Sequence, residues 1–253
     1  MPFAPVLVHG FTGSSASWGS PVVDGLAKAG LAPVAIDLPG HGRYIGETVP
    51  SAFTLEAALA CIASAVRAPA PLIGYSMGGR LALHYALKYP QRVTRLVLES
   101  CSAGLATEEE RSSRRDTDAV LADRIVRLGV EAFIDDWEAL PLFASQAELS
   151  ADARATIREL RLRNAPISLS ASLRGLGPGS LPSLWERLTE ITLPTLVLVG
   201  ELDEKFAEVG ERMAAAMPNA RLVVIPSAGH AIHVEQPKAW CRAVTSFLGP
   251  TGD

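Results

Sequence analysis

The sequence is poor in the features that mark secreted, membrane-spanning and nucleic-acid-binding proteins. It holds only three cysteines among 253 residues, and an odd number of widely spaced thiols does not build the disulfide framework of a secreted protein. No apolar run approaches the roughly 20 residues that span a bilayer, and the N-terminus lacks the basic and apolar segments of a signal peptide. We therefore expect a cytoplasmic protein with reduced thiols and no stable membrane insertion.

Positive charge is also scarce. The 23 basic residues are outnumbered by 27 acidic ones, so the formal net charge of −4 offers no electrostatic footprint for a nucleic acid. Hydrophobic residues make up 48% of the chain and charged residues 20%, which is ordinary for a compact enzyme with one sizeable core. We expect a monomer or a small homo-oligomer that acts on a small molecule.

Short apolar runs alternate with segments of helical spacing, as in parallel sheets built from βαβ units. The predicted strands cover residues 6–8, 34–37, 71–74, 95–99, 195–200 and 222–226. The predicted helices cover residues 55–67, 79–89, 206–217 and 237–248. The interval 102–192 has helical spacing but no convincing strand. The sequence therefore predicts an α/β core formed by residues 1–101 and 193–253, with a helical cap inserted at 102–192.

One motif in this pattern is typical of a catalytic site. Gly74-Tyr75-Ser76-Met77-Gly78 follows the apolar run at 71–73 and precedes a helical segment. A chain that turns this sharply from strand to helix needs small residues two positions before and two after the serine. The pattern predicts a nucleophile elbow with Ser76 at its tip; the alternative is an ordinary strand-to-helix turn.

A serine hydroxyl needs an imidazole to take its proton and a carboxylate to orient that imidazole. Asp203 and His230 each follow a predicted strand, and the order Ser, Asp, His is that of α/β hydrolases. We predict a catalytic triad of Ser76, Asp203 and His230. The alternatives are Glu201 or Glu204 as the acid and His233 as the base.

The segment His9-Gly10-Phe11-Thr12 follows the first predicted strand. Its position predicts an oxyanion hole made by the backbone N–H groups of Phe11 and Met77, which would hold negative charge that develops during the reaction. The His, Cys and carboxylate residues do not fall at zinc-ligand spacing, and a complete Gly-rich nucleotide loop is missing. We therefore expect neither a metal nor a cofactor.

Several segments together carry a family resemblance along almost the whole chain. They are His9-Gly-Phe-Thr-Gly13, Asp37-Leu-Pro-Gly-His-Gly42, Gly74-Tyr-Ser-Met-Gly-Gly-Arg80, Glu109-Glu-Arg-Ser-Ser-Arg114, Asp136-Trp137, Pro141-Leu-Phe-Ala-Ser145, Gly200-Glu-Leu-Asp-Glu-Lys-Phe206 and Ala228-Gly-His-Ala-Ile-His233. The sequence resembles the 2-succinyl-6-hydroxy-2,4-cyclohexadiene-1-carboxylate synthases of menaquinone biosynthesis. The resemblance implies an α/β-hydrolase fold with a mostly parallel central sheet, helices on both faces and a helical cap. The chain starts almost directly at the strand before His9, so we expect reduced N-terminal edge strands.

The same resemblance implies the substrate contacts. It assigns Arg80, Arg114 and Arg161 to the carboxylates of a small polycarboxylate substrate, and places Tyr75 and Trp137 in the pocket wall. Arginine suits this task because its planar fork grips a carboxylate through two hydrogen bonds. Small register changes would substitute Arg115 for Arg114, or Arg158 or Arg163 for Arg161.

Three functions fit this constellation. The resemblance implies a lyase that eliminates pyruvate after Ser76 removes a substrate proton. The first alternative is a hydrolase of esters or carbon–carbon bonds in which Ser76 forms an acyl-enzyme. The second is a non-catalytic binding module, which an intact triad disfavours. The cap arginines favour the lyase, because its substrate carries several carboxylates.

Overall fold

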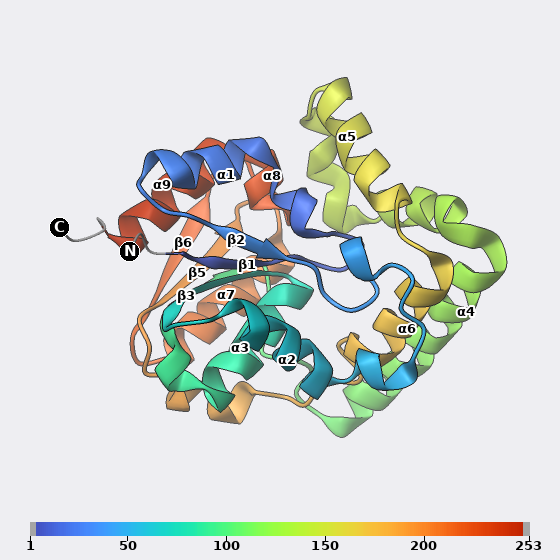
Figure 1. The fold of residues 1–253 in the computed structure, drawn as a ribbon, viewed down its shortest axis with the longest axis horizontal. Helices are drawn as coiled ribbons and strands as arrows, with labels where there is room; N and C mark the ends of the chain where they lie inside the picture. Colours follow the sequence, from blue (N-terminus) through green and yellow to red (C-terminus); the bar gives the residue numbers. More distant parts are fainter. Residues whose placement is uncertain (1–3, 250–253) are drawn as a thin grey trace.

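The computed structural model describes residues 4–249 and shows a central parallel sheet flanked by helices (Figure 1). Six strands lie in the order β2-β1-β3-β4-β5-β6, and every neighbouring pair is parallel. Their bounds are β1 Val6–Val8, β2 Val34–Ile36, β3 Ala70–Tyr75, β4 Val93–Glu99, β5 Thr195–Gly200 and β6 Ala220–Ile225. The predicted fold class is confirmed, because the central strands are apolar runs buried from both sides.

Helices cover both faces of the sheet and close two separate parts of the core. On one face, α1 (Gly19–Lys28) and α9 (Pro237–Leu248) pack Leu26 and Trp240 against the sheet. On the other face, α2 (Leu55–Ala65), α3 (Met77–Lys88) and α7 (Glu204–Ala216) do the same with Ile62, Leu81 and Met213. The helices on the two faces do not cover the carboxyl ends of the strands, where ligands bind in open α/β sheets.

The helix α1 was missing from the sequence prediction. It begins with Gly-Ser-Pro, contains a second glycine and buries only Val22 and Leu26. Glycine is a poor helix former, and two buried residues give a weak periodic signal. The helix forms here because Val22 and Leu26 pack against the sheet beside α9.

The insertion between β4 and β5 consists of helices and turns. It contains α4 (Glu108–Glu138), the 3₁₀ segment η5 (Pro141–Glu148), α5 (Ala151–Leu162), α6 (Pro166–Leu176) and η6 (Trp185–Glu190). Gly129, at φ 84°, breaks α4 into two helical pieces. The insertion has its own apolar cluster, in which Ile125, Ile134 and Leu169 are fully buried. Figure 1 shows these helices as a separate layer beside the sheet.

The last part of the insertion packs differently from the rest. Leu181, Leu184, Leu188 and Ile191 belong to the main core cluster together with α2 and α3. The apolar cluster of the insertion itself ends with Leu173, and Leu176 already belongs to the main core cluster. The turn-rich stretch 175–182 is where the chain returns to the core.

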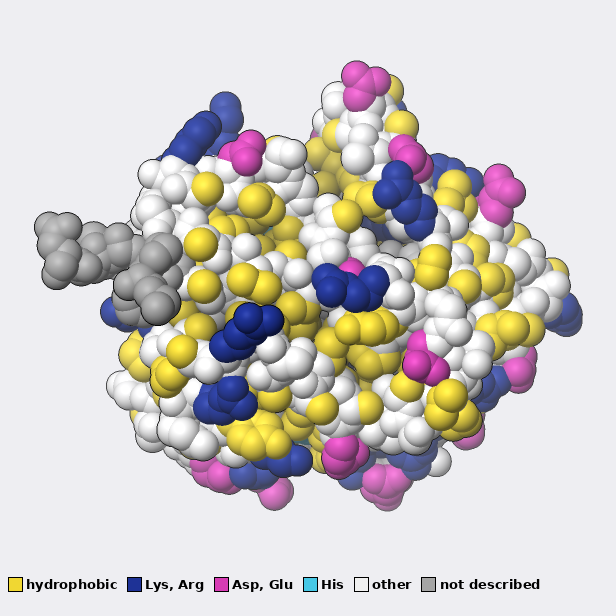
Figure 2. Space-filling model, viewed as in Figure 1, with side chains coloured by type: hydrophobic (Ala, Val, Ile, Leu, Met, Phe, Trp, Pro, Cys, Tyr) yellow, Lys and Arg dark blue, Asp and Glu magenta, His cyan; other side chains and the backbone are white. Residues whose placement is uncertain are grey.

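The N-terminal edge of the sheet is short. In residues 4–249 the edge strand on this side is β2, and the sheet contains no antiparallel strand. Within the same residues, no helix has the length and apolar character to cross a bilayer. On the face shown in Figure 2, acidic and basic side chains lie interspersed over the insertion.

Candidate active site

Ser76 lies at a sharp corner between β3 and α3. Its φ of 50° and ψ of −109° are unusual for a residue with a side chain, and its N–H donates to the Glu99 carbonyl oxygen at 2.9 Å. A Cβ on Gly74 would lie 2.4 Å from the Gly78 carbonyl oxygen, and one on Gly78 would lie 2.2 Å from the Val8 carbonyl oxygen. Both glycines are therefore needed for the backbone to pass this close to itself.

The structure brings Ser76, His230 and Asp203 into one hydrogen-bonded row. His230 Nε2 lies 3.1 Å from the Ser76 hydroxyl, and His230 Nδ1 lies 2.6 Å from Asp203 Oδ2. The other oxygen of Asp203 accepts the Phe206 N–H at the start of α7 at 3.4 Å. With Nδ1–H directed at the carboxylate, Nε2 is free to accept the serine proton.

The three alternative residues have other partners or positions. The Glu201 carboxylate accepts the Ser227 N–H at 2.9 Å and faces solvent. Glu204 lies in the cavity wall but makes no bond to His230. His233 donates from Nδ1 to the fully buried Glu99 carboxylate at 2.7 Å. The geometry thus favours Asp203 as the acid and His230 as the base.

The two residues predicted to supply the oxyanion donors line the same cavity as Ser76. Phe11 and Met77 both line the cavity that contains Ser76, and neither backbone N–H has a partner among residues 4–249. His9 holds the Phe11 loop, because its Nδ1 donates to the Gly10 carbonyl oxygen at 2.7 Å while its Nε2 accepts the Leu38 N–H at 3.0 Å. Burial lowers the pKa of His9 to about 4, so its ring stays neutral and can do both.

A cavity of about 700 Å³ opens above Ser76, between the sheet and the insertion. Its walls include Tyr75 and Trp137, where the resemblance placed them, together with Phe11 and Phe143. The Trp137 ring lies 5.6 Å from Phe11 and 5.7 Å from Phe143, measured between ring centroids. These aromatic rings give the cavity an apolar wall close to Ser76.

Arg80 carries a buried positive charge into this wall. Its side chain is 9% exposed, and Nε has no hydrogen-bond partner among the described residues. Burial is the main cause that lowers the pKa of its guanidinium, to about 10, so the group remains charged at neutral pH. A buried donor without a partner is costly, and an anion that accepts the Nε–H would remove that cost.

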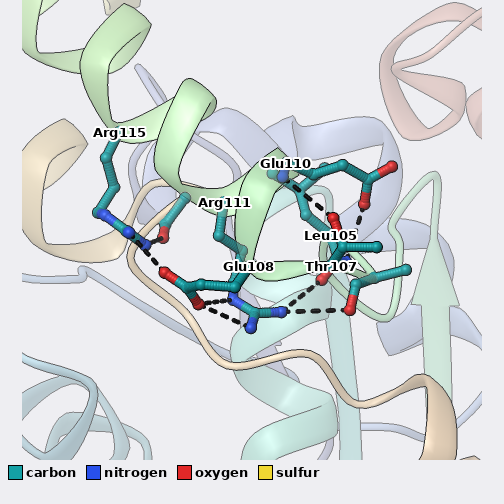
Figure 3. A network of polar contacts seen from close by, with 8 residues as sticks. Leu105, Thr107, Glu108, Glu110, Arg111 and Arg115 are labelled. Atoms are coloured by element: carbon teal, nitrogen blue, oxygen red, sulfur yellow. Dashed lines mark hydrogen bonds and ion pairs between the residues drawn. The ribbon is translucent and has the colours of Figure 1, made fainter.

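Arg114 also lines the cavity but is less committed to it. Its Nε donates to Asp118 at 2.7 Å, and 41% of its side chain is exposed. The alternative residue Arg115 points into a surface network instead: it pairs with Glu108 at 2.6 Å and donates to the Gly179 carbonyl oxygen at 2.9 Å (Figure 3). The structure therefore favours Arg114 over Arg115 as a substrate contact.

The structure does not bring Arg161 into the cavity wall. Its guanidinium pairs with Glu138 at 3.0 Å and lies 4.9 Å from the centre of the Phe143 ring. It lines two neighbouring cavities behind Phe143. Of its two alternatives, Arg158 pairs with Asp135 and Glu138, and Arg163 pairs with Glu159 on the surface. Arg80 and Arg114 thus line the cavity above Ser76, whereas Arg161 lines the neighbouring cavities.

Comparison with known proteins decides the family of this chain. Residues 6–244 match the alpha/beta hydrolase family. A Salmonella heidelberg (strain SL476) protein named 2-succinyl-6-hydroxy-2,4-cyclohexadiene-1-carboxylate synthase is 35% identical over 98% of this chain and 95% of its own length. A Bacillus subtilis (strain 168) protein that bears the same name provisionally is 43% identical over 97% of this chain and 90% of its own. This chain belongs to that synthase family.

A solved structure agrees with this membership. MenH from S. aureus is 36% identical, covers 97% of this chain with 93% of its own, and superposes with a TM-score of 0.90. The family resemblance expected from the sequence is thereby confirmed, and the chain is an enzyme of the α/β-hydrolase superfamily. Among residues 4–249, no group of three or more His, Cys, Asp and Glu residues is placed to hold a metal ion.

The cavity wall of this family member contains three polar residues that the sequence did not single out as site residues: Ser145, Ser172 and Lys205. The hydroxyls of Ser145 and Ser172 are buried and have no partner among the described residues. Ser145 and Lys205 stand in motifs that carried the resemblance, so their segments were noticed. Ser172 lies on α6 in an ordinary helical sequence, where no local signal marks it.

Proposed function

We propose that this enzyme is a lyase that converts 2-succinyl-5-enolpyruvyl-6-hydroxy-3-cyclohexene-1-carboxylate to 2-succinyl-6-hydroxy-2,4-cyclohexadiene-1-carboxylate and pyruvate. The observation that carries this proposal is the buried Arg80 guanidinium, whose Nε lacks a partner in the wall of the cavity above Ser76. An apolar ester would leave this charge unpaired, whereas a polycarboxylate would satisfy it.

In the proposed mechanism the triad acts as a base. His230, oriented by Asp203 at 2.6 Å, takes the hydroxyl proton of Ser76 across 3.1 Å, and the Ser76 oxygen removes a proton from the substrate ring. The Phe11 and Met77 N–H groups hold the negative charge that develops on the substrate. The electron pair of the broken C–H bond enters the ring system, and the C–O bond to the enolpyruvyl group breaks. The departing enolpyruvate takes up the proton that His230 accepted from Ser76 and becomes pyruvate, while Ser76 keeps the proton from the ring, so the triad ends as it began.

In this proposal Arg80 and Arg114 hold the carboxylates nearest the reacting carbon, while Tyr75 and Trp137 enclose the ring. Arg80 is placed by the first turn of α3, directly after the elbow, so its distance from Ser76 is set by a rigid element. Arg161 would reach a substrate carboxylate only after leaving Glu138 and the Phe143 ring.

Turnover of the enolpyruvyl substrate by the purified protein tests the proposal. We expect one pyruvate per diene formed and no mass increase on Ser76 after rapid acid quench. Accumulation of an acyl-Ser76 species in a burst, with the enolpyruvyl substrate left untouched, would show that the enzyme is a hydrolase that works through an acyl-enzyme.

A further inference from the structure

A single carboxylate holds the backbone on both sides of His230. Glu235 Oε2 accepts the Gly229 N–H at 2.6 Å, and Glu235 Oε1 accepts the Ala231 N–H at 3.1 Å. The two oxygens thus bridge the residues immediately before and after the histidine. We propose that Glu235 is a positioning residue that fixes the His230 imidazole between Ser76 and Asp203.

The backbone at Gly229 lies close to both the insertion and the Glu235 carboxylate. A Cβ placed on Gly229 would lie 2.0 Å from the Ser145 hydroxyl oxygen and 3.0 Å from Glu235 Oε2. The glycine is therefore enclosed between the insertion and the Glu235 carboxylate. Because the imidazole must satisfy distances of 2.6 Å and 3.1 Å at its two nitrogens, a small rotation of the 229–231 backbone breaks one of the two bonds.

Glu235 lies at the end of α8 (Ile232–Glu235), a single turn that packs beside α9 (Figure 1). One isolated helical turn is unstable by itself, so its ends must be tied down. Glu99 accepts the N–H and Nδ1–H of His233 within this turn, but Glu99 is fully buried and also accepts the Trp240 Nε1–H. Glu235 is only partly buried, so its replacement tests the His230 position without opening the core.

The chemistry of the bridge explains why a carboxylate is needed. An ionised carboxylate makes short, strong hydrogen bonds and can accept two N–H donors at once. Glutamine has the same shape but a single acceptor oxygen, and its amide group would face one of the two N–H donors. Aspartate keeps both oxygens but is one methylene shorter, so it should restore part of the bridge.

The experiment compares Glu235→Gln, Glu235→Ala and Glu235→Asp with Glu201→Gln. Glu201 is the matched control, because its carboxylate accepts the Ser227 N–H at 2.9 Å in the same loop but does not flank His230. For pyruvate release we expect kcat to fall on the order of 100-fold in Glu235→Gln and Glu235→Ala, as for a misplacement of about 1 Å, with KM within twofold. Glu235→Asp should recover part of kcat, and Glu201→Gln should stay within twofold of the wild type.

A second readout needs no substrate. The proton that His230 Nδ1 shares with Asp203 should give a far-downfield ¹H resonance in the free enzyme, and we expect it to shift or broaden in Glu235→Gln but not in Glu201→Gln. The proposal rests on the proposed role of His230 as base, and this readout separates the two. If the wild type released no pyruvate, the proposed function would fail, and the resonance alone would decide the role of Glu235. An unchanged resonance in Glu235→Gln, with kcat unaltered or only the melting temperature lowered, would overturn the positioning role.

Discussion

The carboxyl ends of the strands and the insertion line the same cavity. The polar side chains of the two regions differ in whether they have hydrogen-bond partners among the described residues. At the sheet edge His230 and Asp203 are paired within the chain at 2.6 Å, and the hydroxyl of Ser76 meets His230. In the insertion Trp137 Nε1, Ser145 Oγ and Ser172 Oγ are buried without partners among residues 4–249. A buried polar group without a partner costs about 1–3 kcal/mol. The difference teaches that Ser76, His230 and Asp203 find their partners within the core, whereas these groups of the insertion, like Arg80 Nε of α3, have none among residues 4–249.

The largest expected effect concerns the hydrogen-bonded row of Ser76, His230 and Asp203 in the core. Ser76→Ala, His230→Ala and Asp203→Asn should each fold normally and lower kcat by roughly 10⁴-fold, because the three groups act as one unit. Steady-state pyruvate release with circular dichroism as the folding check measures this. The effects should not add, so a double variant that is far worse than either single variant contradicts a shared triad.

Acid should weaken the core rather than the insertion. Burial lowers the pKa of His9 to about 4 and that of His41 to about 3, against 6.5 in the unfolded chain, and residues 102–192 contain no histidine. Above pH 6.5 both rings are neutral in both states and this stability is fully present. As the pH falls from 6.5 through about 4, the unfolded chain binds protons at these histidines while the folded chain does not, so the free energy of unfolding falls.

Urea unfolding at several pH values measures this loss. We expect the free energy of unfolding to fall by up to about 1.4 kcal/mol per pH unit for each buried histidine across this window. A His9→Gln variant, in which the amide can still pair with Leu38, should show a shallower slope. A slope identical to that of the wild type would mean that His9 does not contribute.

The next effect tests the arginine that the core presents to the substrate. Arg80→Ala should lower kcat/KM roughly 10- to 150-fold through loss of a charge-assisted bond to a carboxylate. This corresponds to about 1.5–3 kcal/mol of lost transition-state stabilisation. Arg80→Lys should recover only part, because an ammonium lacks the planar fork. Added salt should raise the KM of the wild type. A silent Arg80→Ala combined with salt-independent kinetics would contradict a polycarboxylate substrate.

The smallest expected effect concerns Arg114, the arginine that the insertion contributes to the cavity wall. Arg114 is paired with Asp118, and 41% of its side chain is exposed, so its contact with an anion is more screened than that of Arg80. We expect Arg114→Ala to lower kcat/KM by about 1 kcal/mol, less than Arg80→Ala. Arg115→Ala is the matched control and should leave kcat/KM within twofold. A larger loss for Arg115→Ala than for Arg114→Ala would reverse the choice between them.

The sequence predicted the bounds of a fully buried strand more accurately than those of a partly exposed one. Strand β5 (Thr195–Gly200) is buried at every position, and its bounds were predicted without error from its continuous apolar run. Strand β6 starts at Ala220, two residues before the prediction, because most residues of this edge strand are exposed or only partly buried and give a weaker signal. The helix α3 begins at Met77 rather than at residue 79, since Gly78 and Gly79 in its first turn are poor helix formers and hide its start.

The sequence by itself determined the elbow and the order of Ser76, Asp203 and His230, because the sharp turn and the strand ends depend on neighbouring residues that lie together in the chain. Only the tertiary structure decided which carboxylate reaches His230, that Arg80 and Arg114 line the cavity, and that Arg161 is held by Glu138 behind Phe143. Those contacts join side chains from elements far apart in the sequence. They depend on how the helices of the insertion pack on the sheet, and no local pattern of residues specifies that packing.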